Sequence, residues 1–468
     1  MKKIIIPLLL IVLVLGCSED EPQIGVLLSD EKELLEFKFL KSANQIEVNS
    51  IGEIDNTGVL LFLPPGSDLT NLKPEFVISS KAKATVNGQE IISGQSTVDF
   101  QNGALIKVTA EDGSDKIWDI NIIMDFPALD AAIASLMTQY ETPGFQLAIL
   151  KDEKLVYRKS YGESNVETGE KVTNSSRFRV ASVSKPITQA AILKLAEDLS
   201  DFSLDDKVFG PGSILGNQYG TAPYTADKLD ISVRHLMDHE SGWTNTPNDP
   251  MFSDINLSQT QIIDDMVDNR ALTTTPGSTY SYSNFGYSLL GRIIEELSGM
   301  TYENYINQNI LAPSGVYNME IAGNTIAERK SDEVYYYSQE STSAYDMNVR
   351  RMDAHGGWIA NATDLAEFLT HIDRNSVVAD IITTSSSNET YFGFFNWLHT
   401  GSLPGTASIL NRLNDSFGYA IIGNSRTRPS DTILDGMQLA VETEINTRTL
   451  WPSYDLIDRS LPISSSNN

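Results

Sequence analysis

The sequence predicts a chain of two folded parts: a small all-β sandwich over residues 24–125 and a larger α/β domain of the α+β type over residues 127–446. The first part consists of short β-rich runs separated by Gly, Asp, Asn and Pro, a spacing typical of sandwiches. In the second part, candidate strands occur near both ends and helical patterns lie between them. That order is typical of one antiparallel sheet flanked by helices, with a helical region inserted.

Each predicted element follows from a local pattern. In the sandwich the β-rich runs are GVLLFLPPGSDL, KATVNGQEI and STVDFQNGALIKVTAEDGSDKIWDINII. Pro127 opens an amphipathic helix, because proline is tolerated in a first helical turn. The run FQLAILKDEKLVYRKSYG predicts two strands about the polar turn KDEK. Helices are predicted at ITQAAILKLAEDL, DISVRHLMDHE, SQTQIIDDMVDN, GYSLLGRIIEELSG and ATDLAEFLTHID, followed by strands at TASILNRLN and FGYAIIGNSR and a last helix at SDTILDGMQLAVETEI.

Composition narrows the classes of function. The chain has 468 residues, 41% of them hydrophobic, which is enough for a globular core. Its formal net charge of −28 argues against nucleic acid or an anionic membrane surface as a partner, because both attract basic patches. The acidic residues are spread along the chain, so they are interpreted as a solubilising surface.

The amino terminus resembles a bacterial lipoprotein signal. A short basic start, MKK, precedes an apolar run that is too short to span a membrane. The run ends at Gly16 and Cys17, and Cys17 is the only cysteine. The resemblance implies a lipidated Cys17, with residues 1–17 as the signal and anchor, and a place in the cell envelope at the outer membrane or cell surface. The alternative is a plain secretion signal with an incidental cysteine. With one cysteine no intrachain disulfide can form.

A serine and a lysine lie one helical turn apart in FRVASVSKPITQA. Pro186 predicts a helix start near Ala181 or Ser182, because proline belongs in the first turn. Ser182 would then lie at the positive end of the helix dipole, with Lys185 on the same face. A serine hydroxyl becomes a useful nucleophile when a neighbouring base takes its proton. A desolvated lysine can serve as that base, or can hold another base in its ionised form. Ser182 as an ordinary helix cap is the alternative.

The S-x-x-K spacing is not specific by itself, since it also begins at Ser29 and Ser80 in the predicted sandwich. Two later motifs make it specific: Tyr282-Ser283-Asn284 and His399-Thr400-Gly401. The three motifs follow one another about a hundred residues apart within a single predicted domain.

In this order and with their flanking text, the motifs resemble the serine β-lactamase and penicillin-binding superfamily, specifically the class C β-lactamase branch with its esterases and DD-peptidases. The segments ISVRHLMDHESGW, TPGSTYSYSNFGYSLLG and AHGGWIANATDLAEF carry the flanking resemblance. The preceding sandwich resembles the Ig-like modules of exported Bacteroidetes-type proteins. Such a module is expected to act as a spacer or to dock to the envelope or a glycan.

The resemblance implies a role for each motif residue. Ser182 would attack a carbonyl carbon and carry the acyl group, and Lys185 would lower the pKa of its neighbours. Tyr282, held partly ionised by that lysine, would be the general base. Asn284 would hydrogen-bond Lys185 or the substrate amide.

The third motif would line the substrate site on a strand. There His399 would face the substrate, Gly401 would let it approach closely, and the N–H of Ser402 would join that of Ser182 as an oxyanion hole. Lysine is usual where His399 stands. The absence of that lysine favours an activity like that of relatives that act on esters, on amino-terminal D-residues or on other peptides, over the destruction of penicillins.

No metal or nucleotide cofactor is implied, because no cluster has zinc-ligand spacing and no glycine-rich phosphate loop precedes a helix. The predicted partner is a small-molecule, peptide or cell-wall-derived substrate. Two hypotheses remain open: a serine hydrolase of the cell envelope that cleaves an ester or amide, and a binding or sensor protein that keeps the fold but turns over poorly.

Overall fold

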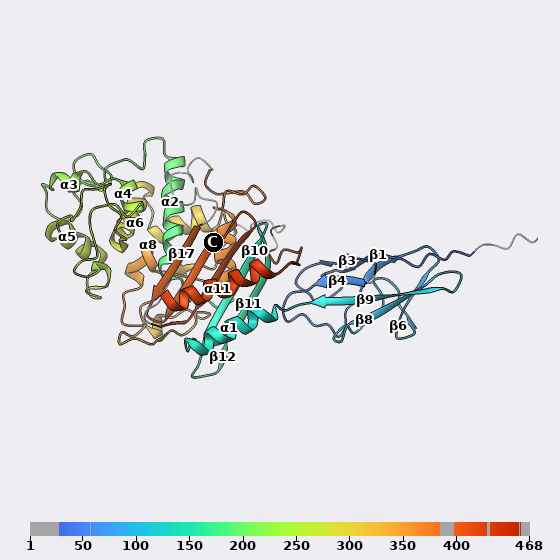
Figure 1. Cartoon of the computed structure of the whole chain (residues 1–468). Coiled ribbons are helices and arrows are strands. Elements are labelled where there is room, and N and C mark those ends of the chain that lie inside the picture. Colours follow the sequence, from blue (N-terminus) through green and yellow to red (C-terminus); the bar gives the residue numbers. More distant parts are fainter. Residues whose placement is uncertain (1–27, 57, 384–396, 428–430, 458, 460–468) are drawn as a thin grey trace, which may run out of the picture.

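The computed structural model describes residues 28–56, 58–383, 397–427, 431–457 and 459. Cys17 and the predicted signal lie outside the described residues. Figure 1 shows an elongated β part joined end to end to a larger domain of strands and helices. Within the described ranges, no helix is long and apolar enough to cross a membrane.

The amino-terminal part consists of two packed sheets, in the orders β2-β1-β5 and β3-β4-β9-β8-β6-β7. Strand β8 alternates buried and exposed residues, so Ala104, Ile106 and Val108 face the core while Leu105 and Lys107 face outward. All pairs in these sheets are antiparallel except β4 with β9. The strands are β1 (Leu34–Phe39), β2 (Ser50–Ile51), β3 (Glu53–Ile54), β4 (Gly58–Phe62), β5 (Glu75–Ile78), β6 (Lys83–Val86), β7 (Gln89–Glu90), β8 (Ala104–Thr109) and β9 (Asp115–Ile123).

One six-stranded antiparallel sheet organises the larger domain, in the order β12-β11-β10-β19-β18-β17. The predicted hairpin forms β10 and β11, and β10 pairs with β19 from near the end of the domain. The two ends of the domain therefore meet in the middle of the sheet, which confirms the predicted fold class. The strands are β10 (Gly144–Lys151), β11 (Lys154–Asn165), β12 (Glu170–Lys171), β17 (Trp397–Leu403), β18 (Thr406–Arg412) and β19 (Phe417–Gly423).

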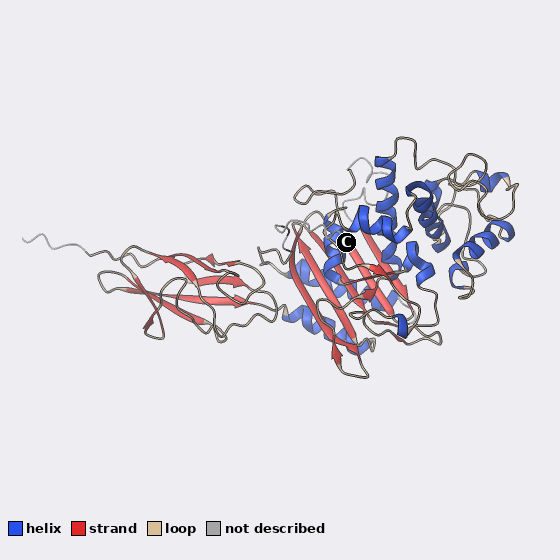
Figure 2. Cartoon of the chain, turned by 180° about the vertical axis from the view of Figure 1, so that it is seen from behind, coloured by secondary structure: helices blue, strands red, loops and turns tan. Residues whose placement is uncertain are grey.

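Helices cover both faces of this sheet (Figure 2). Alternate residues of β10 face opposite ways, so Ile149 packs with α1 (Pro127–Gln139) and α11 (Asp431–Thr447). On the other face, Ala148 packs with α2 (Ser184–Asp198) and α9 (Ala362–Thr370).

The remaining helices form a separate region beside α2, on the side of the sheet away from the β part (Figures 1 and 2). They are α3 (Ala226–Leu229), α4 (Val233–Met237), α5 (Gln259–Asn269), α6 (Asn284–Ser298), α7 (Tyr302–Ile306) and α8 (Asp353–Gly356). The domain also contains short helical turns: η1 (Ala181–Val183), η2 (Pro250–Phe252), η3 (Asn307–Leu311), η4 (Ile326–Glu328) and η5 (Arg350–Met352). Two small sheets complete the domain, built from β13 (Phe178–Arg179), β14 (Glu320–Ile321) and β16 (Trp358–Ala360), and from β15 (Tyr337–Ser338) and β20 (Ser425–Arg426).

The two parts of the chain contact each other directly. Phe62 of β4 is buried in the hydrophobic cluster of the larger domain. Beside it, Arg158 of β11 donates a hydrogen bond to the Glu47 carboxylate at 2.6 Å. The β part is therefore packed against the sheet as well as joined to it by the chain.

Candidate active site

Ser182 lies in a sharp turn between strand β13 and helix α2. The preceding residue, Ala181, has a φ of +48°, a left-handed conformation that an alanine adopts only under constraint. The chain then makes the single turn η1 and enters α2 at Ser184. Pro186 is thus in the first turn of α2, and the predicted helix start near Ser182 is a 3₁₀ turn that continues into the α-helix.

Lys185 is fully buried beneath the serine and has three oxygen partners. Its Nζ donates to Ser182 Oγ at 3.2 Å, to Asn284 Oδ1 at 2.7 Å and to the His355 carbonyl oxygen at 2.7 Å. Burial lowers the pKa of Lys185 from its usual 10.5 to about 7, against the opposing charge of Asp249. Near neutral pH a large share of this lysine is therefore an uncharged amine, which can accept a proton.

Tyr282 lies on the other side of the serine, with its hydroxyl 2.9 Å from Ser182 Oγ. Burial raises the pKa of Tyr282 well above its usual 10, so its phenol stays protonated at neutral pH. The sequence-based interpretation made a partly ionised Tyr282 the base; that assignment remains a prediction, which the raised pKa of Tyr282 does not favour. Lys185 is the group near its pKa, and Tyr282 is a hydrogen-bond donor to the serine oxygen.

His239 supports Tyr282 from behind. Its ring lies 4.6 Å from the Tyr282 ring, centroid to centroid, and its Nδ1 accepts a hydrogen bond from the Ser283 N–H at 3.1 Å. Burial and the charge of Lys185 lower the pKa of His239 to about 3. The imidazole is therefore neutral and packs against the tyrosine ring.

A carboxylate that the sequence analysis missed orients Asn284. The amide of Asn284 accepts from Lys185 through Oδ1 and donates through Nδ2 to Asp249 Oδ2 at 2.7 Å. Because a carboxylate only accepts hydrogen bonds, Asp249 holds the NH₂ side of the amide toward itself and the oxygen toward the lysine. Asp249 is itself held by the Met251 N–H at the start of η2.

The isosteric change Asp249→Asn separates charge from orientation. It removes the negative charge that raises the pKa of Lys185 and keeps an oxygen that can accept from Asn284. The pKa of Lys185 then falls further, so more uncharged amine is present at acid pH. We expect the acid limb of the kcat/KM profile to move to lower pH, which a pH series from 5 to 9 would measure.

Asp254→Asn is the matched control, because it makes the same charge change in the same loop without touching Asn284. An acid limb that stays in place in Asp249→Asn, or moves equally in the control, would contradict the electrostatic link. Asp249→Ala removes the acceptor as well, so we expect a lower kcat from a misoriented Asn284.

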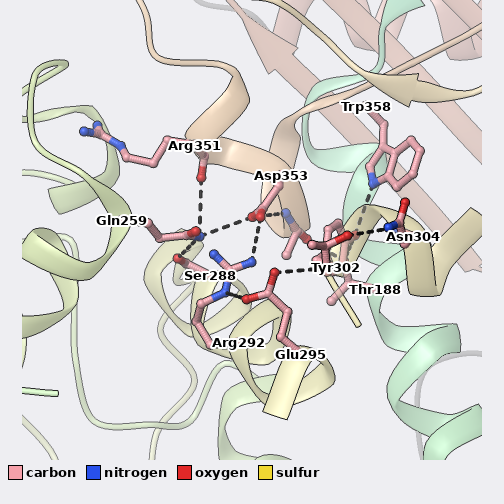
Figure 3. Close-up of polar contacts among 12 residues, drawn as sticks. Thr188, Gln259, Ser288, Arg292, Glu295, Tyr302, Asn304, Arg351, Asp353 and Trp358 are labelled. Atoms are coloured by element: carbon pink, nitrogen blue, oxygen red, sulfur yellow. Dashed lines mark hydrogen bonds and ion pairs between the residues drawn. The ribbon is translucent and has the colours of Figure 1, made fainter. Parts of the chain in front are cut away.

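A buried polar network fixes the turn that presents the His355 carbonyl (Figure 3). Asp353, which begins α8, pairs with Arg292 at 2.7 Å and accepts from Gln259 Nε2 at 3.2 Å. One turn along α2 from Lys185, Thr188 donates to the Ala354 carbonyl oxygen at 2.6 Å. Helices α2, α5 and α6 thus all hold α8, and α8 in turn holds the lysine.

The third motif lies on β17, beside η1. At Gly401 an added Cβ would come 2.2 Å from the Val180 carbonyl oxygen and 2.2 Å from Ser408 Oγ. The glycine was expected to let the substrate approach closely, and that role remains a prediction. Its missing side chain lets strand β17 lie directly against the turn that carries Ser182.

His399 and Ser402 both line the same cleft as Ser182. His399 Nδ1 lies 3.1 Å from the Thr400 carbonyl oxygen, and burial and the charge of Lys185 lower the pKa of His399. The imidazole therefore stays neutral at neutral pH and supplies no positive charge. Ser402 Oγ accepts from Arg426 Nη1 at 2.6 Å. The N–H groups of Ser402 and Ser182 as an oxyanion hole remain a prediction.

The cleft has a volume of about 950 Å³ and is large enough for a small-molecule or peptide substrate. The predicted residues that line this cleft are Ser182, Tyr282, Asn284, His399 and Ser402. Lys185 and Gly401 lie directly behind them. In the described part of the chain, no group of three or more His, Cys, Asp or Glu side chains is arranged to hold a metal ion.

A serine between a buried lysine and a tyrosine, at the edge of an antiparallel sheet flanked by helices, defines the class of serine hydrolases with a β-lactamase and DD-peptidase fold. The family model described as beta-lactamase matches residues 129–424, and the chain belongs to this family. A second model, described as the amino-terminal domain of SGBP, matches residues 36–122.

Similar proteins share the domain over part of their length. D-aminopeptidase of Gluconobacter oxydans is 26% identical over 54% of this chain and 46% of its own length. Penicillin-binding protein 4* of Bacillus subtilis is 29% identical over 43% of this chain and 44% of its own. The chain thus spans less than half the length of these relatives.

Two solved structures share the fold. The octameric penicillin-binding protein homologue from Pyrococcus abyssi has a TM-score of 0.56 and 24% identity, covering 69% of this chain and 78% of its own. D-amino acid amidase from Ochrobactrum anthropi SV3 has a TM-score of 0.55 and 19% identity, covering 68% of this chain and 99% of its own.

Proposed function

We propose that this chain is a serine hydrolase of the cell envelope that cleaves an ester or amide bond through an acyl-enzyme on Ser182. The observation that carries the proposal is the position of Ser182 Oγ, 3.2 Å from Lys185 Nζ and 2.9 Å from the Tyr282 hydroxyl. One neighbour has its pKa near neutrality and the other is a proton donor, which suits both halves of an acyl transfer.

The proton follows a closed path in the proposed reaction. As the bond from Ser182 Oγ to the carbonyl carbon forms, the hydroxyl proton passes to the uncharged amine of Lys185. The bond to the leaving oxygen or nitrogen then breaks, and that atom takes a proton from the Tyr282 hydroxyl. Lys185 then passes the proton that it took from Ser182 to the Tyr282 oxygen. A water molecule hydrolyses the acyl-serine by the same steps in reverse, so the enzyme returns to its starting state.

The comparisons support an amide or ester substrate without naming one. The similar proteins include one named D-aminopeptidase and one named D-amino acid amidase, and both names describe cleavage beside a D-residue. The neutral imidazole of His399 stands where penicillin-destroying relatives usually have lysine. We therefore propose esters or amides as substrates ahead of β-lactams.

A turnover panel tests the proposal. It comprises short-chain nitrophenyl esters, a D-amino-acid amide, a D-Ala-D-Ala peptide and nitrocefin, with a fluorophosphonate probe to label the serine. We expect labelling and measurable ester turnover, with slow nitrocefin hydrolysis because His399 offers no charge to the substrate carboxylate. Fast nitrocefin hydrolysis without esterase activity would reverse the substrate order.

The sensor hypothesis makes the opposite prediction in the same panel. A protein that keeps the fold but turns over poorly would take up neither the fluorophosphonate nor a labelled penicillin under conditions where a reference hydrolase takes up both. Such a result would shift attention to the amino-terminal part and its match to the SGBP domain.

Lipid anchoring at Cys17 is part of the proposal for the cellular location. A lipidated Cys17 would tether the chain to the envelope and leave the β part of residues 34–123 as the spacer, where it can dock to envelope or glycan. Metabolic labelling with a fatty-acid analogue tests the anchor. Wild type should incorporate the label and Cys17→Ala should not.

A further inference from the structure

The substrate cleft has one wall made by an irregular loop, residues 249–257, which we call the strap. Met251, Phe252 and Ile255 of the strap line the cleft. Phe252 is 42% exposed and Ile255 is 47% exposed, so two large apolar side chains face solvent in the cleft that also contains Ser182. Apolar area exposed in a cleft is typical of a surface that a ligand covers.

Polar contacts hold the backbone of the strap at both ends and in the middle. Arg351 donates to the carbonyl oxygens of Met251, at 3.0 Å, Asp254, at 2.6 Å, and Leu257, at 2.5 Å. Figure 3 shows the Arg351 side chain extending away from Asp353 and the buried network. Asn348 Nδ2 donates to the Ile255 carbonyl oxygen at 2.9 Å. A loop held in this way presents its apolar side chains in fixed positions, ready for a ligand.

The charges of the cleft oppose a substrate carboxylate. Among the described residues that line it, the only arginine or lysine is Arg426. Arg426 is already paired with the Glu340 carboxylate at 2.5 Å and with Ser402 Oγ at 2.6 Å, and its side chain is only 4% exposed. The other charged side chains of the lining are Asp238 and Asp346, both acidic.

From the strap and this charge pattern, we infer that the enzyme takes an ester or amide whose apolar group packs on Phe252 and Ile255 and which has no carboxylate beside the scissile bond. The inference rests on the proposed function and adds a substrate class to it. Glu340 is a further specificity-determining residue, because its carboxylate pairs with Arg426.

Two ester series test the apolar part. One varies the acyl chain on a nitrophenyl leaving group from two to eight carbons, and the other varies the alkyl leaving group on a fixed acetyl group. Each buried methylene adds about fourfold to transition-state binding. We expect kcat/KM to rise by about this factor per methylene over the first few carbons in one of the series.

The variant Phe252→Ala/Ile255→Ala should flatten that rise, so kcat/KM should fall several-fold more for the long-chain esters than for the shortest ester. Leu439→Ala is the matched control, because Leu439 is exposed on α11 and does not line the cleft. Flat series in wild type, or an unchanged slope in the double variant, would overturn the inference. Absence of both labelling and turnover would instead overturn the proposed hydrolase.

A pair of amide substrates tests the charge part, one with a carboxylate beside the scissile amide and the other with a carboxamide in its place. We expect wild type to prefer the carboxamide by at least tenfold. Glu340→Gln removes one anionic partner of Arg426, so the preference should narrow several-fold. Asp346→Asn makes the same charge change without releasing an arginine and should narrow it less. A wild-type preference for the carboxylate substrate would overturn this part.

Discussion

Ser182→Ala is expected to lower kcat for ester and amide substrates by about 10⁴-fold or more and to abolish fluorophosphonate labelling. Removing a nucleophile removes the covalent route, and losses of this size are typical when a hydrolase loses its serine. Initial rates on the best ester, with melting temperature as a check on folding, would measure the effect. The fold should persist, because the change removes a single oxygen that faces the cleft.

The matched control is Ser80→Ala, at an S-x-x-K spacing that recurs in the amino-terminal part. Ser80 is exposed and lies outside the cleft, so its removal should leave both labelling and turnover unchanged. If Ser182→Ala labels as well as wild type, Ser182 is not the nucleophile. If Ser80→Ala loses activity, the amino-terminal part contributes to the reaction in a way that the cleft does not explain.

Much of the fold could be predicted because its periodic patterns are long. Hydrophobic periodicity extends along most of each of these elements: the hairpin β10–β11, the late strands β18 and β19, and helices α2, α5 and α6. The predicted helix DISVRHLMDHE is the exception, since α4 spans only Val233–Met237. Its pattern continues, but His239 adopts a φ of +61° and turns the chain toward Tyr282. Packing at the site outweighed local helical preference there.

The candidate site likewise contains residues that could be predicted from the sequence and one that could not. Ser182, Lys185, Tyr282 and Asn284 lie in or next to regular elements, so their spacing in sequence predicts their meeting in space. Asp249 could not be found that way, because it lies in an irregular loop where a helix-capping role explains it equally well.

Two features of the site have no signal in the sequence at all. The partner that His355 offers to Lys185 is a backbone carbonyl oxygen, which every residue type possesses. The protonation of Tyr282 depends on burial among residues far from it in sequence, such as Lys185 and His239, which pack on its ring. Protonation states that depend on desolvation therefore could not be predicted from the sequence.

Catalysis should depend on pH through Lys185. The pKa of this lysine is about 7 in the folded protein, and the reactive form is the uncharged amine. Since the amine loses its proton as pH rises through the pKa, kcat/KM should be low at pH 5, rise through pH 7 and level off above it. A profile measured on a neutral ester, whose own charge does not change in this range, would show the limb directly.

Lys185→Met tests the same group by removal. It keeps a chain of similar length and abolishes the proton acceptor, so we expect kcat to fall by roughly 10² to 10⁴-fold and the acid limb near pH 7 to disappear.

Although Lys185→Met should lose activity, its folded state should be more stable than that of wild type at low pH. The folded-state pKa of about 7 lies below the usual 10.5, so wild type bears the cost of charging a buried lysine fully below pH 7 and less as pH rises from 7 toward 10.5. The variant should therefore melt at a higher temperature than wild type at pH 6, with the gap narrowing at pH 9. A variant that keeps the acid limb would show that another group controls it, and loss of activity with a lower melting temperature at both pH values would point to a damaged fold.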